Sequence, residues 1–156
     1  MNKGTSVLII LIFFAFPLVS FPGVFKVFPG AKLEDTYEAR QSEIGNKMSK
    51  GPKVIIFTTN DLFENVVAFY RGIAKEYRMP GSSGKPTKLS SGQELKEAYF
   101  IFDNAADIMT SKHWIKIQRP YLSRERTKEG FQGKYGAVRE VTAIIEEDKR
   151  SYSYKD

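Results

Sequence analysis

Apolar side chains recur at helical spacing between residues 62 and 77, and this is the clearest pattern in the chain. The stripe consists of Leu62, Val66, Phe69, Tyr70, Ile73 and Tyr77. Asn60 or Asp61 is the expected N-cap, and with Asp61 in that position Glu64, three residues later, completes a capping box. The Met-Pro-Gly run at 79–81 ends the pattern. We therefore predict one long amphipathic helix whose apolar stripe packs against a sheet.

Segments rich in β-branched and aromatic residues lie on both sides of this helix and are typical of strands. They cover residues 53–59, 95–105, 113–119 and 137–147, with a weaker candidate at 24–31. The segment 95–105 is apolar on both faces, which predicts a central strand. Along 113–119, His113, Ile115, Ile117 and Arg119 alternate with Trp114, Lys116 and Gln118.

The connections between these segments fix the expected class. A short surface helix is predicted after Asp35, and loops are predicted at 80–94 and 122–136, where Gly, Ser, Pro and charged residues gather. The last strands are joined without a second long helix, so they should be mostly antiparallel. The predicted fold is α+β, with one long helix packed on a mostly antiparallel sheet of about four to five strands.

The N-terminus differs from the rest of the chain. After a start that contains Lys3, residues 5–21 carry no charge, which is typical of a secretory signal peptide. Ser20 is a small residue at the expected cleavage position, and Pro17 ends the apolar helix before it. An uncleaved anchor is the alternative, although the run is slightly short for a membrane span. Either way, we expect the remaining residues outside the cytoplasm, periplasmic or extracellular.

Composition agrees with a single domain at 21–150, after a signal segment at 1–20 and before a polar tail at 151–156. The chain has no cysteine, which excludes disulfides, thiolate metal sites and cysteine nucleophiles, and favours a bacterial envelope protein. The formal net charge is +6, and residues 110–135 hold seven Lys or Arg against two Glu. Such a region either meets an anionic partner or is a solvated loop.

Candidate catalytic chemistry is sparse. His113 is the only histidine, and it has no sequence motif of partners around it. Asp103 and Asp107 would share one face if their segment were helical, where two carboxylates could bind a cation or perform acid–base chemistry. Strand-end turns use the same residues, and that interpretation is preferred. We expect no catalytic residue, no metal site and no cofactor.

The favoured function is binding through a sheet face and a rim of basic and aromatic residues. Trp114, Lys116, Arg119 and Tyr121 are the predicted binding residues, because aromatic and Arg side chains tend to anchor interfaces. The expected partner is an envelope protein or an anionic or polysaccharide polymer. Nucleic acid is not expected for an exported chain, and a membrane only through residues 5–21 if these are not cleaved. The oligomeric state is left open.

Two alternatives belong to other classes. A small-ligand carrier would have a pocket between helix and sheet, lined by aromatic side chains such as Phe69, Tyr70 and Phe100. A small hydrolase or isomerase would use Asp103, Asp107 and His113.

Overall fold

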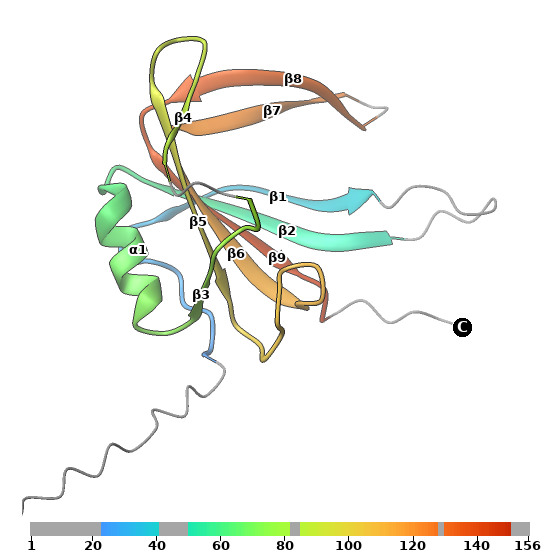
Figure 1. The fold of residues 1–156 in the computed structure, drawn as a ribbon. Helices are drawn as coiled ribbons and strands as arrows, with labels where there is room; N and C mark the ends of the chain where they lie inside the picture. The colour runs from blue at the N-terminus through green and yellow to red at the C-terminus, as the bar shows by residue number, and fades with distance from the viewer. Residues whose placement is uncertain (1–22, 41–49, 82–84, 128–129, 151–156) are drawn as a thin grey trace, which may run out of the picture.

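The computed structural model describes residues 23–40, 50–81, 85–127 and 130–150 (Figure 1). These residues form one helix, α1 (Phe63–Arg71), and nine strands. The strands are β1 (Lys32–Arg40), β2 (Lys50–Thr59), β3 (Lys75–Tyr77), β4 (Thr87–Lys88), β5 (Glu94–Ile101), β6 (His113–Arg119), β7 (Tyr121–Thr127), β8 (Gly130–Arg139) and β9 (Thr142–Asp148). The predicted α+β class with a mostly antiparallel sheet is confirmed.

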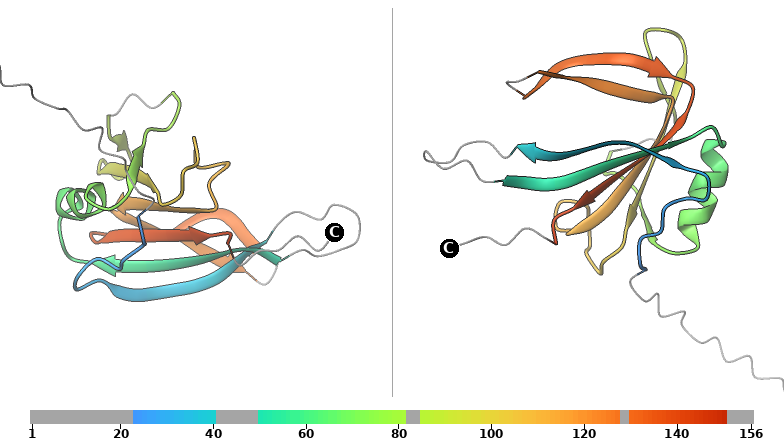
Figure 2. Two further views of the ribbon diagram at one scale, coloured as in Figure 1. Left: turned by 90° about the horizontal axis from the view of Figure 1, so that it is seen from below. Right: turned by 180° about the vertical axis from the view of Figure 1, so that it is seen from behind.

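Seven strands form one sheet in the order β1-β2-β9-β6-β5-β3, with β4 pairing the outer edge of β5 beside β3. Every pair in this sheet is antiparallel. Strand β9 lies between β2 and β6, so the centre of the sheet joins segments that are far apart in sequence. Strands β7 and β8 form a separate hairpin that stands away from the main sheet (Figures 1 and 2).

The two faces of the large sheet carry different cores. On the helix face, Ile115, Ile117 and Ile144 are fully buried together with Phe100, and the α1 residues Val66, Val67 and Tyr70 pack on them. On the second face, a smaller cluster holds Val54, Ile56, Ala143 and Tyr121. The period-2 alternation of β9 places Ile144 in the first core and Ala143 in the second, whereas β6 contributes Ile115 and Ile117 to the first core alone.

The helix is shorter than predicted. It ends at Arg71, and the N–H groups of Gly72 and Ile73 bond carbonyls three residues back, which closes its last turn. The predicted C-terminal part instead contains β3, whose Lys75 and Tyr77 pair with β5. Glycine lowers the stability of a helix interior by about 1 kcal/mol, whereas the exposed edge of β5 offers ladder hydrogen bonds. The helical spacing of Ile73 and Tyr77 was therefore misleading.

The predicted capping box is also wrong. Leu62 occupies the N-cap position and no side chain caps the helix. The Asp61 carboxylate accepts hydrogen bonds from the Leu62 N–H and the Asn65 side chain, so it lies one residue too early for a cap. Glu64 pairs with Lys96 of β5 at 2.6 Å instead of turning back to the helix start.

The region before β2 was predicted incorrectly in two places. Residues 24–31 form no strand; they cross the helix face as extended coil, where Phe25 and Phe28 pack on the core, and turn at Gly30. The first part of the weak helix predicted after Asp35 belongs to the strand β1, which pairs with β2 through two register irregularities, and residues 41–49 of that segment lie outside the described residues. Pairing with β2 satisfies the backbone of a segment that has too few apolar residues to anchor a helix.

The strand count also exceeds the prediction, since nine strands rather than four to five lie in the described residues. Much of the excess comes from the predicted loop 122–136, which contributes to the β7–β8 hairpin. The frequent charged residues of this segment made it look like a loop. A two-stranded hairpin can form its backbone hydrogen bonds without burying a full apolar face, so its sequence need not alternate between apolar and polar residues. The strand predicted at 113–119 is confirmed as β6, and 95–105 contains β5, which has neighbours on both sides.

Candidate functional site

The four predicted binding residues do not share one surface. Trp114 and Lys116 point to the second face of the sheet, whereas Arg119 points to the helix face, as the alternation of β6 requires. Tyr121 begins β7 and is buried in the second-face cluster, with the Arg139 guanidinium 5.1 Å from its ring centre. The structure thus places two half-buried residues on the second face and a third on the helix face, and buries Tyr121.

Trp114 and Lys116 belong to a row of side chains that we call the aromatic strip, formed by Tyr77, Tyr99, Trp114 and Lys116. The strand register places Tyr77 opposite Tyr99 and Tyr99 opposite Lys116. The Tyr99 and Trp114 rings lie 6.4 Å apart, and the Lys116 ammonium lies 6.0 Å from the Tyr99 ring centre. All four side chains are half-buried, so the strip offers ring surface and a cation on a rigid sheet.

Carboxylates set the electrostatics of the strip. Glu97 lies beside Tyr99 on β5 and pairs with Lys116 at 2.5 Å. Burial raises the pKa of Tyr99 to about 12, and the charge of Glu97 adds to the shift. Tyr99 is therefore neutral at physiological pH and keeps its hydroxyl as a donor. The indole N–H of Trp114 is buried without a hydrogen-bond partner in the described part of the chain.

Arg119 fastens the start of the helix to the sheet. Its guanidinium donates to the Asp61 carbonyl at 2.9 Å and to the Thr142 hydroxyl at 3.1 Å. The Thr142 hydroxyl in turn donates to the same carbonyl at 2.7 Å. These contacts give Arg119 a structural role, and its proposed part in binding stays a prediction, as does that of Tyr121.

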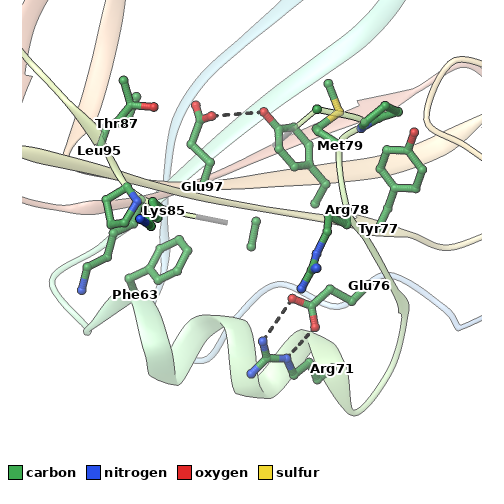
Figure 3. Close-up of a pocket in the computed structure, with 16 residues that line it drawn as sticks. Phe63, Arg71, Glu76, Tyr77, Arg78, Met79, Lys85, Thr87, Leu95 and Glu97 are labelled. Carbon is green, nitrogen blue, oxygen red and sulfur yellow. Dashed lines mark hydrogen bonds and ion pairs between the residues drawn. The ribbon is translucent and has the colours of Figure 1, made fainter. Parts of the chain in front are cut away.

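A groove of about 930 Å³ runs along the outer edge of β5, which we call the edge groove (Figure 3). Strand β3 pairs with residues 99–101 of β5 and β4 pairs with residues 94–95, and no described strand pairs with residues 96–98 on this side. Its lining includes Phe63 of α1, side chains of the 76–81 and 85–87 segments, and residues 95–99 of β5. Tyr77 and Tyr99 belong to both the groove and the strip, so the two surfaces are continuous.

The backbone of β5 is accessible in this groove. The Phe102 N–H bonds the His113 carbonyl, so the even-numbered residues of β5 direct their backbone groups towards β6. Odd-numbered residues therefore face outward, and Tyr99 and Leu95 meet β3 and β4. Glu97 lies between them, and the pairing of the described strands gives its outward N–H and C=O no partner.

The groove has a cationic excess. Four cations, Arg71, Arg78, Lys85 and Lys96, line it with two carboxylates, Glu76 and Glu97. Arg71 forms a two-bond pair with Glu76, and this hydrogen bonding lowers the pKa of Glu76 (Figure 3). The lining therefore carries an excess of two positive charges, which favours an anionic ligand.

The Asp103 and Asp107 side chains stabilise the turns between β5 and β6 by accepting hydrogen bonds. The Asp103 carboxylate accepts hydrogen bonds from the Lys112 N–H at 2.6 Å and the Ser111 hydroxyl at 3.0 Å. Partial burial raises the pKa of Asp103, but its hydrogen bonds outweigh this effect, so the pKa is lowered. Asp107 accepts from the Thr110 N–H at 2.8 Å, which lowers its pKa too. The preferred turn interpretation is confirmed for both, and neither carboxylate hydrogen-bonds the His113 ring in the described contacts.

His113 instead belongs to a cluster that the sequence did not predict. Its Nε2 lies 2.8 Å from the Glu146 carboxylate, and both side chains are buried. Asp148 lies close by, and the ligand-type atoms of all three lie within 4.8 Å of one another. The available signal was alternation, since Glu146 and Asp148 share a face with Ile144, but the pairing of β9 with β6 is not readable from sequence.

The pocket proposed for a carrier is filled by its own side chains. Tyr70 and Phe100 are fully buried with ring centres 6.0 Å apart, and Phe69 packs against Tyr70. The edge groove lies at the border of the sheet rather than inside this interface.

Comparison with known proteins found no matching family model, no matching curated protein and no matching solved structure. The one helix in the described residues is not long and apolar enough to cross a membrane. The signal or anchor segment predicted at 1–20 and the polar tail predicted at 151–156 lie outside the described residues.

Proposed function

We propose that this protein is an exported, non-catalytic binding module that holds an acidic polysaccharide across the aromatic strip and the edge groove. The observation that carries the proposal is the continuity of the two surfaces through Tyr77 and Tyr99. Ring faces in the strip suit the apolar faces of sugar units, and the cationic excess of the groove suits their acidic groups. Export is proposed from the uncharged segment at 5–21.

Shape supports a chain-like ligand over a compact one. The lining of the groove follows residues 95–99 of β5, and its Tyr77 and Tyr99 also belong to the strip on the second face of the sheet. The outward backbone N–H and C=O of Glu97, which no described strand pairs, add one donor and one acceptor for hydroxyl groups at the junction. A polymer that crosses both surfaces would gain from several weak contacts at once.

Affinity electrophoresis tests the proposal with polygalacturonate as the acidic polymer and dextran as the neutral one. We expect polygalacturonate to retard the protein and Trp114→Ala to weaken retardation about tenfold, the magnitude of losing one stacked ring beside a cation. Lys116→Ala should weaken it less and reduce its salt sensitivity. The control is Lys32→Ala on the exposed strand β1, at the opposite edge of the sheet, which should change nothing.

The proposal fails if polygalacturonate does not retard the wild-type protein, or if Trp114→Ala and Lys32→Ala behave alike. Retardation by galacturonate monomers as strong as by the polymer would favour the carrier alternative. Export is tested separately by sequencing the N-terminus of protein recovered outside the cytoplasm. A start near residue 21 supports cleavage, a start at Met1 with membrane association supports the anchor, and recovery only in the cytosol contradicts export.

A further inference from the structure

We propose that His113, Glu146 and Asp148 form a binding site for a divalent transition-metal ion of the zinc type. The site lies at the start of β6 and the end of β9, on the helix face of the sheet and away from the edge groove on β5. It is independent of the polysaccharide proposal, which uses none of these three residues.

Strand geometry brings the three ligands together. The register places His113 opposite Asp148, and Ile115 opposite Glu146, so all three side chains project from one face. Glu146 and Asp148 are two residues apart on one central strand, and His113 begins its hydrogen-bonded neighbour. Ligands carried by paired strands are held more rigidly than ligands on loops, which favours a preformed site.

The donor set selects the class of metal. One imidazole nitrogen with two carboxylate oxygens suits zinc and similar ions, whereas magnesium and calcium prefer oxygen ligands throughout. Ligand atoms at about 2.0–2.2 Å around a tetrahedral ion stand about 3.3 Å from one another. The His113–Glu146 distance of 2.8 Å must open slightly, and Asp148, within 4.8 Å, must close in.

Charge and burial favour a cation here. His113 is 2% exposed and Glu146 is 6% exposed, while Asp103 approaches the same corner from the turn before β6. Three carboxylates, those of Asp103, Glu146 and Asp148, act on the Arg150 guanidinium, and the strand register adds one further cation, Lys53, opposite Asp148. A divalent ion would offset the remaining negative charge, which is costly to bury alone.

The surroundings also resemble those of a ligating histidine. The Phe25 and Phe102 rings flank the imidazole, with ring centres 5.8 and 5.1 Å away, and form an apolar wall that limits water. Access remains on the other side, past Asp148 and the largely exposed side chain of Arg150.

Arg150 is the internal competitor for this site. It holds both oxygens of Asp148, at 2.9 and 2.8 Å, and must leave before that carboxylate can bind a metal. Because its side chain is 58% exposed, it can withdraw into water at small cost. Removing Arg150 should therefore strengthen metal binding.

The experiment uses purified protein without a histidine tag, titrated with zinc chloride by calorimetry. We expect one ion per chain, at least tenfold weaker binding in Asp148→Asn and in His113→Gln, and tighter binding in Arg150→Gln. Glu94→Gln, an exposed carboxylate on β5, is the control and should bind as the wild type does. Cobalt should give the visible absorption of a four-coordinate nitrogen–oxygen site.

Asp148→Asn keeps the proposal testable if His113→Gln fails to fold, because Asp148 is partly exposed. Magnesium chloride should give no heat of binding. Absence of zinc binding overturns the proposal, and so does zinc binding that Asp148→Asn leaves unchanged. Equal affinities of Arg150→Gln and the wild type would also contradict it, since the competition on which it depends would be absent.

Discussion

Replacing Arg119 tests whether this residue holds the fold together. In the structure its guanidinium bridges the loop before α1 and the start of β9 through the Asp61 carbonyl and the Thr142 hydroxyl. The side chain is 21% exposed and Thr142 is fully buried, so water cannot easily replace these bonds. Arg119→Ala should therefore destabilise the protein, although the position looked like a binding residue from sequence.

The size of the effect follows from the hydrogen bonds that Arg119→Ala removes. A hydrogen bond from a charged donor contributes about 1.5–3 kcal/mol to stability. Arg119 donates two such bonds, one to the Asp61 carbonyl and one to the adjacent Thr142 hydroxyl. The Asp61 carbonyl keeps its bond from Thr142, which limits the effect. We expect Arg119→Ala to lower the free energy of unfolding by about 2–4 kcal/mol. Thr142→Val should cost about 1–2 kcal/mol, and the double variant less than the sum of the two.

Urea denaturation followed by circular dichroism measures these differences, with the slope against urea expected to stay constant. Arg71→Ala is the matched control, because the Arg71–Glu76 pair has short bonds but is 58% and 44% exposed. An exposed pair of this kind contributes about 0–1 kcal/mol. If Arg119→Ala is no more destabilising than Arg71→Ala, the bridging role assigned to Arg119 is wrong.

Three further outcomes are expected. Tyr70→Phe removes the hydroxyl that donates a hydrogen bond to the Lys26 carbonyl at 3.0 Å, and it should lower stability by about 1 kcal/mol in a thermal melt. No change in stability would show that this bond does not hold the N-terminal segment. Gly23→Ala should lower stability by about 1–3 kcal/mol, because a Cβ there would lie 1.5 Å from the Ile73 carbonyl oxygen. The control is Gly72→Ala, where the nearest atom to the added Cβ is 3.3 Å away, and it should be nearly neutral. Equal effects of the two substitutions would exclude close approach as the cause. Tyr99 should ionise near pH 12, measured as the difference between spectroscopic titrations of the wild type and Tyr99→Phe. Its raised pKa supports the fold below about pH 10 and withdraws that support as pH rises towards 12, so a difference signal centred near pH 10 would contradict the burial described for it.

The strands that were predictable are those whose side chains meet two different environments. In β6, Ile115 and Ile117 face the helix while Trp114 and Lys116 face the other side, and this contrast is visible as alternation. The sequence of the β7–β8 segment shows no such alternation and carries many charged residues, so it looked like a loop. The helix was overextended for the opposite reason, because Ile73 and Tyr77 happen to continue a periodicity that Gly72 and the pairing of β3 interrupt.

The sites were less predictable than the strands because they depend on which strands become neighbours. Tyr77, Tyr99 and Trp114 come from three strands, and only the register aligns them. His113 and Glu146 are 33 residues apart, and a lone histidine carries no sign of its partner. Local pattern assigns a residue to a face, whereas strand order, which is set by the packing of the whole domain, decides what lies beside it.

The position of β9 has a consequence for how this molecule matures. Its seven residues leave the ribosome after all the other described strands, yet they fill the gap between β2 and β6. Until they arrive, both inner edges are open and the sheet exists at most as separate pieces. Completion of the sheet must therefore wait for β9 to be synthesised, and a truncation that removes this strand should be far more damaging than one that removes the peripheral strand β1.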